Sequence, residues 1–535
     1  MKTTMESAEA QDAPFERKQR LSRSVVWQLQ RDYFARHGIE AWSSGAVPHH
    51  VTSSPFIADA YARVVLGFLR DCLSAQTSSS AAIDPSQPVY FVELGAGSGR
   101  FAYVFLKKFL SIRASSVLKD IPIKYVMTDL AEQNLEYCRA HPWLRSFIEE
   151  GLLDFAQFDI ERDENISLLE SGTVLSPETV RNPLVVIANY IFDSVPQDAF
   201  YAGQGQLFEA VATLTTPEPG DMEVSFDHNL IDENYYEDPK WDSILQEYKQ
   251  RLSNTAFLFP TAALHCIQNL NRLSAGRMLL VSGDKGFTQD EALQLGRGMP
   301  LFTFHGSFSM MVDYQIIGEY CRHLGAQVLN PPRPSEHLNV SAFVFGDLPG
   351  DFSETRQAYA ETIEEFGPDD FFVLKEGIGE IYESLTLNQI LAFLRLSRWD
   401  YKRFCEYLPA LKKDLHAITD LQKQHLYEAI VKVWDCYLPI GEEGDLAFEL
   451  GTFLLEMEFH AEALMFLQCS KDLNGLAPGT AYNIAVCHYS LGQIEHALAS
   501  VEQALEMDPA FEEARVLRTA LTTDPVSPGT TQDEV

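Results

Sequence analysis

The stretch VYFVELGAGSGRF, residues 89–101, constrains the fold of this chain more than any other feature. It begins with β-branched and aromatic residues, which are typical of a buried strand, and then turns through Gly95, Gly97 and Gly99. A helix is predicted directly after the turn, because apolar residues from Phe101 onward recur at helical spacing. Strand, glycine turn and helix form the opening unit of a nucleotide-binding α/β domain, in which the amides of the helix start face a ligand.

An acidic residue, Glu93, stands at the end of this strand, just before the turn. The glycine spacing is G-x-G-x-G and differs from the G-x-G-x-x-G of dinucleotide binders. The combination resembles motif I of class I S-adenosylmethionine (SAM) methyltransferases. SAM carries a positive sulfonium and an amino-acid tail but no phosphate, so a carboxylate suits it. The resemblance implies that Glu93, Gly95, Gly97 and Gly99 bind SAM; the alternative is a tight turn without a ligand.

Two further predicted strands each end near an acidic residue. The segment IKYVMTDL predicts a second strand that ends at Asp129, where an acid can bond both ribose hydroxyls of a nucleoside. The segment GLLDFAQFDIE places Asp159 after a short third strand, where SAM enzymes commonly have an acid that meets the adenine amino group. Asp154 is close enough to compete for this second role. A solvent-facing acid at a strand end is the alternative for Asp129.

A fourth strand, residues 184–188, runs into a polar turn that contains Asn189, Asp193 and Pro196. Ligands bind at the carboxyl ends of strands in open α/β sheets. We therefore expect Asn189 and Asp193 to be catalytic, with Asp193 orienting the methyl acceptor and Asn189 positioning the acceptor or the methionine end of SAM. The alternative is local, because Asn and Asp side chains also cap turns.

The order of these elements resembles the MidA family of SAM-dependent methyltransferases, which includes the mitochondrial complex I assembly methyltransferase. The resemblance covers roughly residues 25–345 and implies a Rossmann-like class I sheet. It departs from the family at Tyr190, where the family usually has an acid after the Asn. The matching segments are ELGAGSGRF at 93–101, IANYIFDSVP at 187–196, VSGDKG at 281–286, FHGSFSMMVDY at 304–314 and, more loosely, the region that ends in VTSSPF at 51–56.

Two segments are predicted to cover the site. Helices before motif I often cover the cofactor in methyltransferases, and the loop GAVPHHVTSSPF at 45–56 lies between two such helical patterns. Its adjacent histidines, His49 and His50, favour a lid over a metal site, since no second ligand cluster accompanies them. His305 lies in a later segment that would close the substrate pocket, although a lone histidine is more often structural.

The end of the chain contains a repeat. Ala463-Leu464 recurs as Ala497-Leu498, 34 residues later, and Ala447-Phe448 recurs as Ala481-Tyr482 at the same interval. Small residues at this period, with Pro509 closing the unit, are typical of tetratricopeptide (TPR) repeats. Stacks of such hairpins form concave surfaces that bind peptides. The alternative is a helical domain that only packs against the catalytic half.

We therefore expect an α/β methyltransferase domain with a helical N-terminal cap, followed by an all-α, TPR-like domain. The predicted boundaries are a disordered N-terminus at 1–20, a helical cap and linker at 21–88, a methyltransferase domain at 89–346 with a substrate-side insertion at 221–275, a linker at 347–375, a helical TPR-like domain at 376–524 and a disordered tail at 525–535.

The net charge of −35 disfavours nucleic acid as a partner, because such a surface repels phosphate backbones. It attracts basic proteins or peptides, unless it serves only solubility. The sequence shows neither an apolar run of membrane-spanning length nor an apolar signal segment, so we expect a cytoplasmic protein without a membrane partner. The eight cysteines are scattered without a Cys/His cluster, which predicts reduced thiols and no metal site.

The resulting hypothesis is a SAM-dependent methyltransferase that acts on a protein side chain, with arginine favoured by the family resemblance. The TPR-like domain would bind the protein partner or substrate. A small-molecule methyltransferase, whose helical domain forms a homodimer, is one alternative. A non-catalytic scaffold that keeps only the methyltransferase fold is the other, and Tyr190 is the main point in its favour.

Overall fold

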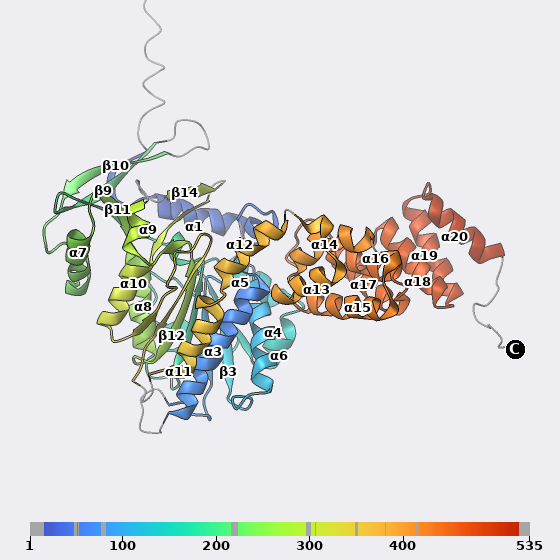
Figure 1. Ribbon diagram of the computed structural model, residues 1–535, viewed down its shortest axis with the longest axis horizontal. Coiled ribbons are helices and arrows are strands. Elements are labelled where there is room, and N and C mark those ends of the chain that lie inside the picture. Colours follow the sequence, from blue (N-terminus) through green and yellow to red (C-terminus); the bar gives the residue numbers. More distant parts are fainter. Residues whose placement is uncertain are drawn as a thin grey trace, which may run out of the picture. The chain divides into compact units, whose positions relative to one another are not determined.

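The computed structural model describes residues 15–47, 51, 53–75, 82–215, 223–295, 301–304, 307–347, 351–379, 381–413 and 415–523. Its contacts divide the chain into two units (Figure 1). The first comprises Met1–Gly379 with the short segment Leu438–Gly441, and the second comprises Glu380–Tyr437 with Glu442–Val535. The first unit holds all the strands of the described chain, and the second holds helices.

A seven-stranded sheet forms the centre of the first unit (Figure 1). Its five strands from β12 to β4 are parallel, whereas β18 is antiparallel to both of its neighbours. Continuous runs of buried residues in β2 and β12 fit a parallel sheet that is covered on both faces. The prediction of a mixed α/β architecture is thereby confirmed. In spatial order the strands are β17 (Gln327–Leu329), β18 (Asn339–Val344), β12 (Met278–Asp284), β7 (Leu184–Asn189), β2 (Val89–Leu94), β3 (Ile123–Asp129) and β4 (Leu153–Gln157).

The order of the strands reverses beside β2. The chain passes from β2 to β3 and β4 on one side, and then returns to place β7 and β12 on the other side. At such a reversal the loops that follow two adjacent strands diverge, and the crevice between them is the usual ligand site of an open α/β sheet. The glycine turn after β2 and the polar turn after β7 both lie at this point.

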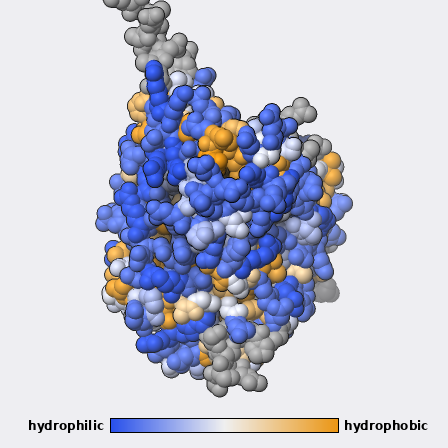
Figure 2. Space-filling view, turned by 90° about the vertical axis from the view of Figure 1, so that its left-hand side faces the viewer, coloured by the Kyte–Doolittle hydropathy of each residue, from blue (hydrophilic) through white to orange (hydrophobic). Residues whose placement is uncertain are grey.

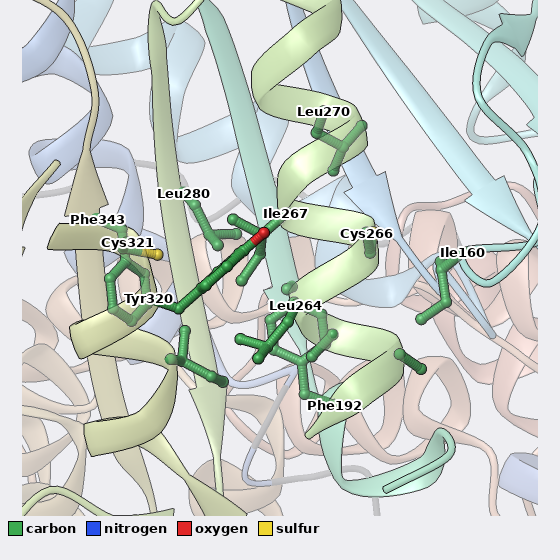
Figure 3. Packing of buried hydrophobic residues seen from close by; sticks show 14 of the residues in the cluster. Ile160, Phe192, Leu264, Cys266, Ile267, Leu270, Leu280, Tyr320, Cys321 and Phe343 are labelled. Carbon is green, nitrogen blue, oxygen red and sulfur yellow. The ribbon is translucent and has the colours of Figure 1, made fainter. Parts of the chain in front are cut away.

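Helix α8 (Thr261–Leu273) shows how the sheet is covered. Figure 3 shows Leu264, Ile267 and Leu270 of this helix directed at the sheet, near Leu280 of β12. All four side chains are almost completely buried. Phe192, which directly precedes Asp193, belongs to the same hydrophobic core. The turn after β7 is thus held in place by Phe192, which packs in the hydrophobic core.

The segment predicted as a linker at 347–375 is structured where it is described. It forms α11 (Ser353–Tyr359), a π-helical turn (Ala360–Glu364) and most of α12 (Pro368–Gly379), all within the first unit. Asp71 of α3 (Pro55–Ser74) accepts hydrogen bonds from the backbone N–H of Thr355 at 2.8 Å and from its hydroxyl at 2.6 Å. Figure 1 shows α3 and α11 side by side. The segment was predicted as a linker because of its acidic composition, although it also contains buried aromatic residues such as Phe352.

A second, five-stranded sheet contains the strands β1 (Glu16–Arg20), β9 (Gln206–Thr215), β8 (Asp198–Gly203) and β11 (Thr255–Phe259), with β10 (Glu223–Leu230) paired to β9. The prediction of disorder for 1–20 is wrong for β1, because strand pairing with β9 orders this polar segment. The predicted insertion at 221–275 contains β10, α7 (Pro239–Arg251), β11 and the core helix α8. Figure 2 shows a face dominated by hydrophilic side chains, as the net charge of −35 leads one to expect.

The second unit is built from helices throughout its described residues. Two hairpins near its end place Ala463 and Ala497, which are 34 residues apart in the sequence, at buried positions of their second helices. Nowhere in the described ranges is a helix both long and apolar enough to cross a membrane. The helices of this unit are α13 (Leu387–Leu396), α14 (Tyr401–Lys413), α15 (Asp420–Asp435), α16 (Leu446–Glu456), α17 (His460–Asn474), α18 (Pro478–Ser490), α19 (Ile494–Met507) and α20 (Glu512–Thr523).

Candidate cofactor and active site

The glycine turn joins β2 to helix α4 (Arg100–Ala114) and requires glycine for two reasons. Gly95, Gly97 and Gly99 have φ angles of +65°, +52° and +74°, a region that side chains with a Cβ disfavour. Space is also lacking. A Cβ on Gly97 would lie 3.0 Å from the indole ring of Trp42, and one on Gly95 would lie 2.8 Å from the side chain of Ile191.

Asp129, at the end of β3, holds this turn in place. Its Oδ2 accepts a hydrogen bond from the backbone N–H of Gly97 at 2.9 Å, and its Oδ1 accepts one from Ala131 at 2.8 Å. Burial raises the pKa of Asp129, and the two backbone amides oppose that rise. Asp129 also lines the larger cavity, and a carboxylate oxygen can accept more than one hydrogen bond, so it can reach a bound hydroxyl group.

Two adjoining cavities lie along the ends of these strands. The larger, of about 430 Å³, has Asp129 and Asp159 in its wall. The smaller, of about 200 Å³, has Glu93, Asn189 and Asp193 in its wall. The cavities have six residues in common and therefore meet. These are Gln30, Phe34 and Trp42 from the N-terminal helices and Gly95, Tyr190 and Ser194 from the turns after β2 and β7.

The two acids considered for the adenine contact have different surroundings. Asp159 lines the larger cavity, where its carboxylate binds the guanidinium of Arg31 at 2.9 Å (Nη1 to Oδ2). Asp154 is completely buried, lies 3.4 Å from the ammonium of Lys124, and accepts backbone hydrogen bonds from Glu170 and Ser171. It lines neither cavity. Of the two acids, only Asp159 is therefore placed to reach a ligand in the larger cavity.

Glu93 is a buried carboxyl group without a full set of partners. Its Oε2 has no hydrogen-bond partner among the described residues, and the side chain lines the smaller cavity. Burial, together with the nearby carboxylate of Asp129, raises the pKa of Glu93 to about 8. A buried polar atom without a partner is costly to the fold. Its position beside a cavity suits a ligand that carries a hydrogen-bond donor.

The turn after β7 presents Asn189 and Asp193 to the smaller cavity. Asn189 accepts a hydrogen bond at Oδ1 from the hydroxyl of Tyr61 at 3.3 Å. The next residue, Tyr190, has a φ angle of +54°, and its backbone N–H bonds to the carbonyl oxygen of Gly283 at 2.8 Å. A Cβ on Gly283 would lie 2.2 Å from the hydroxyl of Tyr61, so the neighbouring strand must carry glycine here.

Asp284 stands at the end of β12, in the segment VSGDKG that resembles the family, and is a reserve candidate for catalysis behind Asp193. Its Oδ2 accepts a hydrogen bond from the backbone N–H of Phe192 at 3.1 Å, which fixes the turn that carries Asp193. Burial and the negative charge of Asp193 raise the pKa of Asp284 well above its usual range. Burial also raises the pKa of Asp193, whose Oδ1 accepts a hydrogen bond from the hydroxyl of Ser194 at 2.7 Å. Two neighbouring buried carboxyl groups of this kind tend to share one proton.

Some predicted features lie outside the described residues, namely His49, His50 and His305. In the described ranges, no group of three or more His, Cys, Asp or Glu side chains is arranged to hold a metal ion. The aromatic residues Phe34 and Trp42, which line both cavities, were not identified from the sequence. Their helices were predicted only as a general cover, because no local pattern indicates which side chains of a cover face a ligand.

Comparison with known proteins bears directly on this site. Residues 74–294 match the model of a family described as "Putative S-adenosyl-L-methionine-dependent methyltransferase". The cofactor that this match indicates is SAM. The matched residues contain all the predicted SAM-binding and catalytic residues, from Glu93 to Asp193, together with Asp284. None of the curated proteins matches the chain.

Two solved structures also resemble the chain. One is a COG1565 superfamily member from Burkholderia thailandensis bound to S-adenosyl-homocysteine. It is 14% identical to this chain and has a TM-score of 0.37, and the match covers 63% of this chain and 96% of that chain. The other is a thermophilic TPR protein from Thermus thermophilus, with 17% identity, 32% of this chain and 91% of that chain covered, and a TM-score of 0.21. TM-scores this low do not establish a shared fold.

The residues around the two cavities fit SAM. The carboxylate of Asp129 lines the larger cavity and can accept from the ribose hydroxyls, and the partnerless Oε2 of Glu93 can accept a hydrogen bond from the ammonium of the amino-acid tail. The turn at Gly97 leaves no room for a side chain beside the smaller cavity. A nucleoside in the larger cavity and an amino-acid tail in the smaller one are therefore compatible with the groups present.

Proposed function

We propose that this protein is a class I SAM-dependent methyltransferase that acts on a protein side chain, with arginine as the favoured acceptor. The observation that carries the proposal is the meeting of the two cavities at the point of strand reversal. One cavity has the ribose candidate Asp129 in its wall, and the other has Asn189 and Asp193. A cofactor that spans both would bring its methyl group to the two predicted catalytic residues.

SAM supplies an electrophilic methyl group when bound, and the protein's own residues act on the acceptor. Asn189, oriented by the hydroxyl of Tyr61, positions the acceptor nitrogen. Asp193 binds the acceptor's positive charge and aligns the nitrogen with the methyl carbon, since alignment supplies much of the rate of such reactions. The methylated nitrogen then releases one proton. The pair Asp193 and Asp284 can accept it, because the raised pKa of both groups suits them to hold a proton near neutral pH.

The carboxyl pair supports a cationic acceptor over a neutral small molecule. A guanidinium group presents several N–H donors in one plane and matches a carboxylate at two points. Arginine is favoured among cationic acceptors by the resemblance to the MidA family. Tyr190, which stands where that family has an acid, favours the non-catalytic scaffold as the second candidate. Burial and the carboxylates of Asp284 and Asp193 raise the pKa of Tyr190, so its hydroxyl stays neutral and cannot replace that acid.

We also propose that the second unit is TPR-like and binds a protein partner or substrate, and that the protein works in the cytoplasm. The support for the TPR-like unit is the 34-residue interval between the buried residues Ala463 and Ala497 and the helical hairpins around them. The test is mass spectrometry of lysate proteins incubated with the enzyme and isotope-labelled SAM. Label on arginine of one or a few proteins is the expected result. Label only on small molecules would favour the second enzyme hypothesis, and no label at all would favour the scaffold.

A further inference from the structure

We infer that Trp42, supported by Phe34, is a cofactor-binding residue that recognises the positive charge of the SAM sulfonium through its aromatic ring. The inference rests on the proposed function, in that it takes SAM to be the ligand of the two cavities. It adds a residue from the N-terminal cover to a site that is otherwise built from strand ends. Neither the glycine motif nor the acids after the strands indicate such a residue.

The position of Trp42 is fixed from two sides. It lies in the short helix α2 (Glu40–Ser43), with its indole ring beside Gly97, where a Cβ on the glycine would lie 3.0 Å from the ring. On the other side, the ring of Phe34 from helix α1 (Val26–His37) stacks against it, with 5.5 Å between centroids and 24° between planes. Trp42 is thus held between α1 and the glycine turn, at the boundary of both cavities.

The covalent order of SAM places its sulfonium at this boundary. The sulfur lies between the ribose and the amino-acid tail. If Asp129 binds the ribose in the larger cavity and Glu93 binds the tail in the smaller one, the sulfur lies where the cavities meet. Trp42 and Phe34 of the N-terminal helices line the place where the cavities meet. Tyr190 and Ser194 line it from the turn after β7.

The charge of a sulfonium is suited to an aromatic ring. The sulfur carries three carbon substituents and no hydrogen, so it cannot donate a hydrogen bond. Aromatic faces attract such cations, as they attract quaternary ammonium groups, and tryptophan does so most strongly. Gln30 of the N-terminal helices also lines the place where the cavities meet, but its side-chain amide is hydrogen-bonded to the backbone of Phe308. It donates to the carbonyl of Phe308 at 2.7 Å and accepts from the N–H of Phe308 at 3.0 Å.

Binding of SAM and of its neutral product, S-adenosyl-homocysteine, distinguishes charge recognition from simple contact. The two ligands differ by one methyl group and the positive charge. Trp42→Leu keeps an apolar side chain but removes the ring, and it should weaken SAM about tenfold more than it weakens the product, as measured by titration calorimetry on the full-length protein. Trp42→Phe should retain most of the preference. Trp143→Leu, at a residue that lines neither cavity, is the control and should leave both affinities unchanged.

Equal losses of SAM and product in Trp42→Leu would overturn the inference, because they would show contact without charge recognition. If the wild-type protein bound neither ligand, this result would contradict the proposed function, and the inference that rests on it would also be wrong. Tryptophan fluorescence provides a second measurement should Trp42→Leu not fold. SAM should change the emission of the wild-type protein more than the product does, and Trp42→Phe should abolish that difference. A difference that persists in Trp42→Phe would also overturn the inference.

Discussion

The carboxylate of Asp129 accepts a hydrogen bond from the backbone N–H of Gly97 at 2.9 Å, and this bond joins the end of β3 to the glycine turn after β2. The residue proposed to bind the ribose therefore also fixes the loop that borders the cofactor. A change at either residue is expected to affect the other. A substitution of Asp129 is therefore expected to disturb the glycine turn as well as the ribose contact.

Asp129→Ala should weaken SAM binding by about 1–3 kcal/mol, the usual effect of leaving polar groups without their charged partner. It leaves the ribose hydroxyls without an acceptor and also frees the N–H of Gly97. Asp129→Asn keeps one oxygen and should lie between the alanine variant and the wild type. Calorimetry measures all three. Equal affinity in Asp129→Ala and wild type would show that another acid binds the ribose.

Gly97→Ala should weaken SAM binding strongly, because the added Cβ meets Trp42 at 3.0 Å and the φ angle of +52° disfavours alanine. Gly151→Ala is the matched control. Its φ angle is +71°, but a Cβ there meets nothing within 4 Å, so it carries the backbone strain alone. Both variants should lose some thermal stability, and only Gly97→Ala should lose SAM. Comparable SAM affinity in the two variants would contradict the account.

Glu93 should make the stability of the ligand-free protein depend on pH. Its pKa is raised to about 8 in the folded state, whereas the unfolded chain has about 4.3, so the folded state binds the proton more tightly. Between these values the free energy of unfolding should fall as the pH rises. Glu93→Gln should show a shallower fall from pH 5 to pH 8 in denaturant titrations, by about 1.4 kcal/mol per pH unit at most. An unchanged slope would show that Glu93 ionises normally.

Asp193→Asn should separate catalysis from cofactor binding. Asp193 lies in the cavity beside Asn189 and away from the ribose candidate Asp129, so SAM affinity should stay nearly the same. Turnover should fall by about 10²-fold or more, the scale typical of losing one oriented electrostatic group. If Asp193 only caps the turn, asparagine replaces it almost equally well, and activity survives. Methyl transfer at the wild-type rate by this variant would remove Asp193 from the mechanism.

The sequence allowed the central elements to be predicted because their signals are local. The strand β2, the glycine turn and helix α4 follow one another within residues 89–114, and Asp129 and Asn189 each stand at the end of an apolar strand. The sheet order that brings these strand ends together was expected only through the family resemblance. The predicted roles of these residues stay predictions until binding and activity are measured.

The contacts that complete the site join distant parts of the chain. Asp284 belongs to the site because β12 pairs with β7, and Trp42 belongs to it because α2 lies against Gly97. Helix α11 was predicted as linker because its acidic composition outweighed its few aromatic residues. Its burial depends on Asp71, which lies 284 residues before Thr355. No pattern within a short window contains this information.

Titration of the full-length protein with SAM in a calorimeter tests the central claim most directly. We expect a dissociation constant in the micromolar range, which corresponds to about −8 kcal/mol, with one SAM bound per chain. Gly97→Arg should abolish this binding, because its long side chain would displace Trp42 and fill the junction of the two cavities. The absence of SAM binding to the folded wild-type protein would contradict the account and leave the scaffold hypothesis in its place.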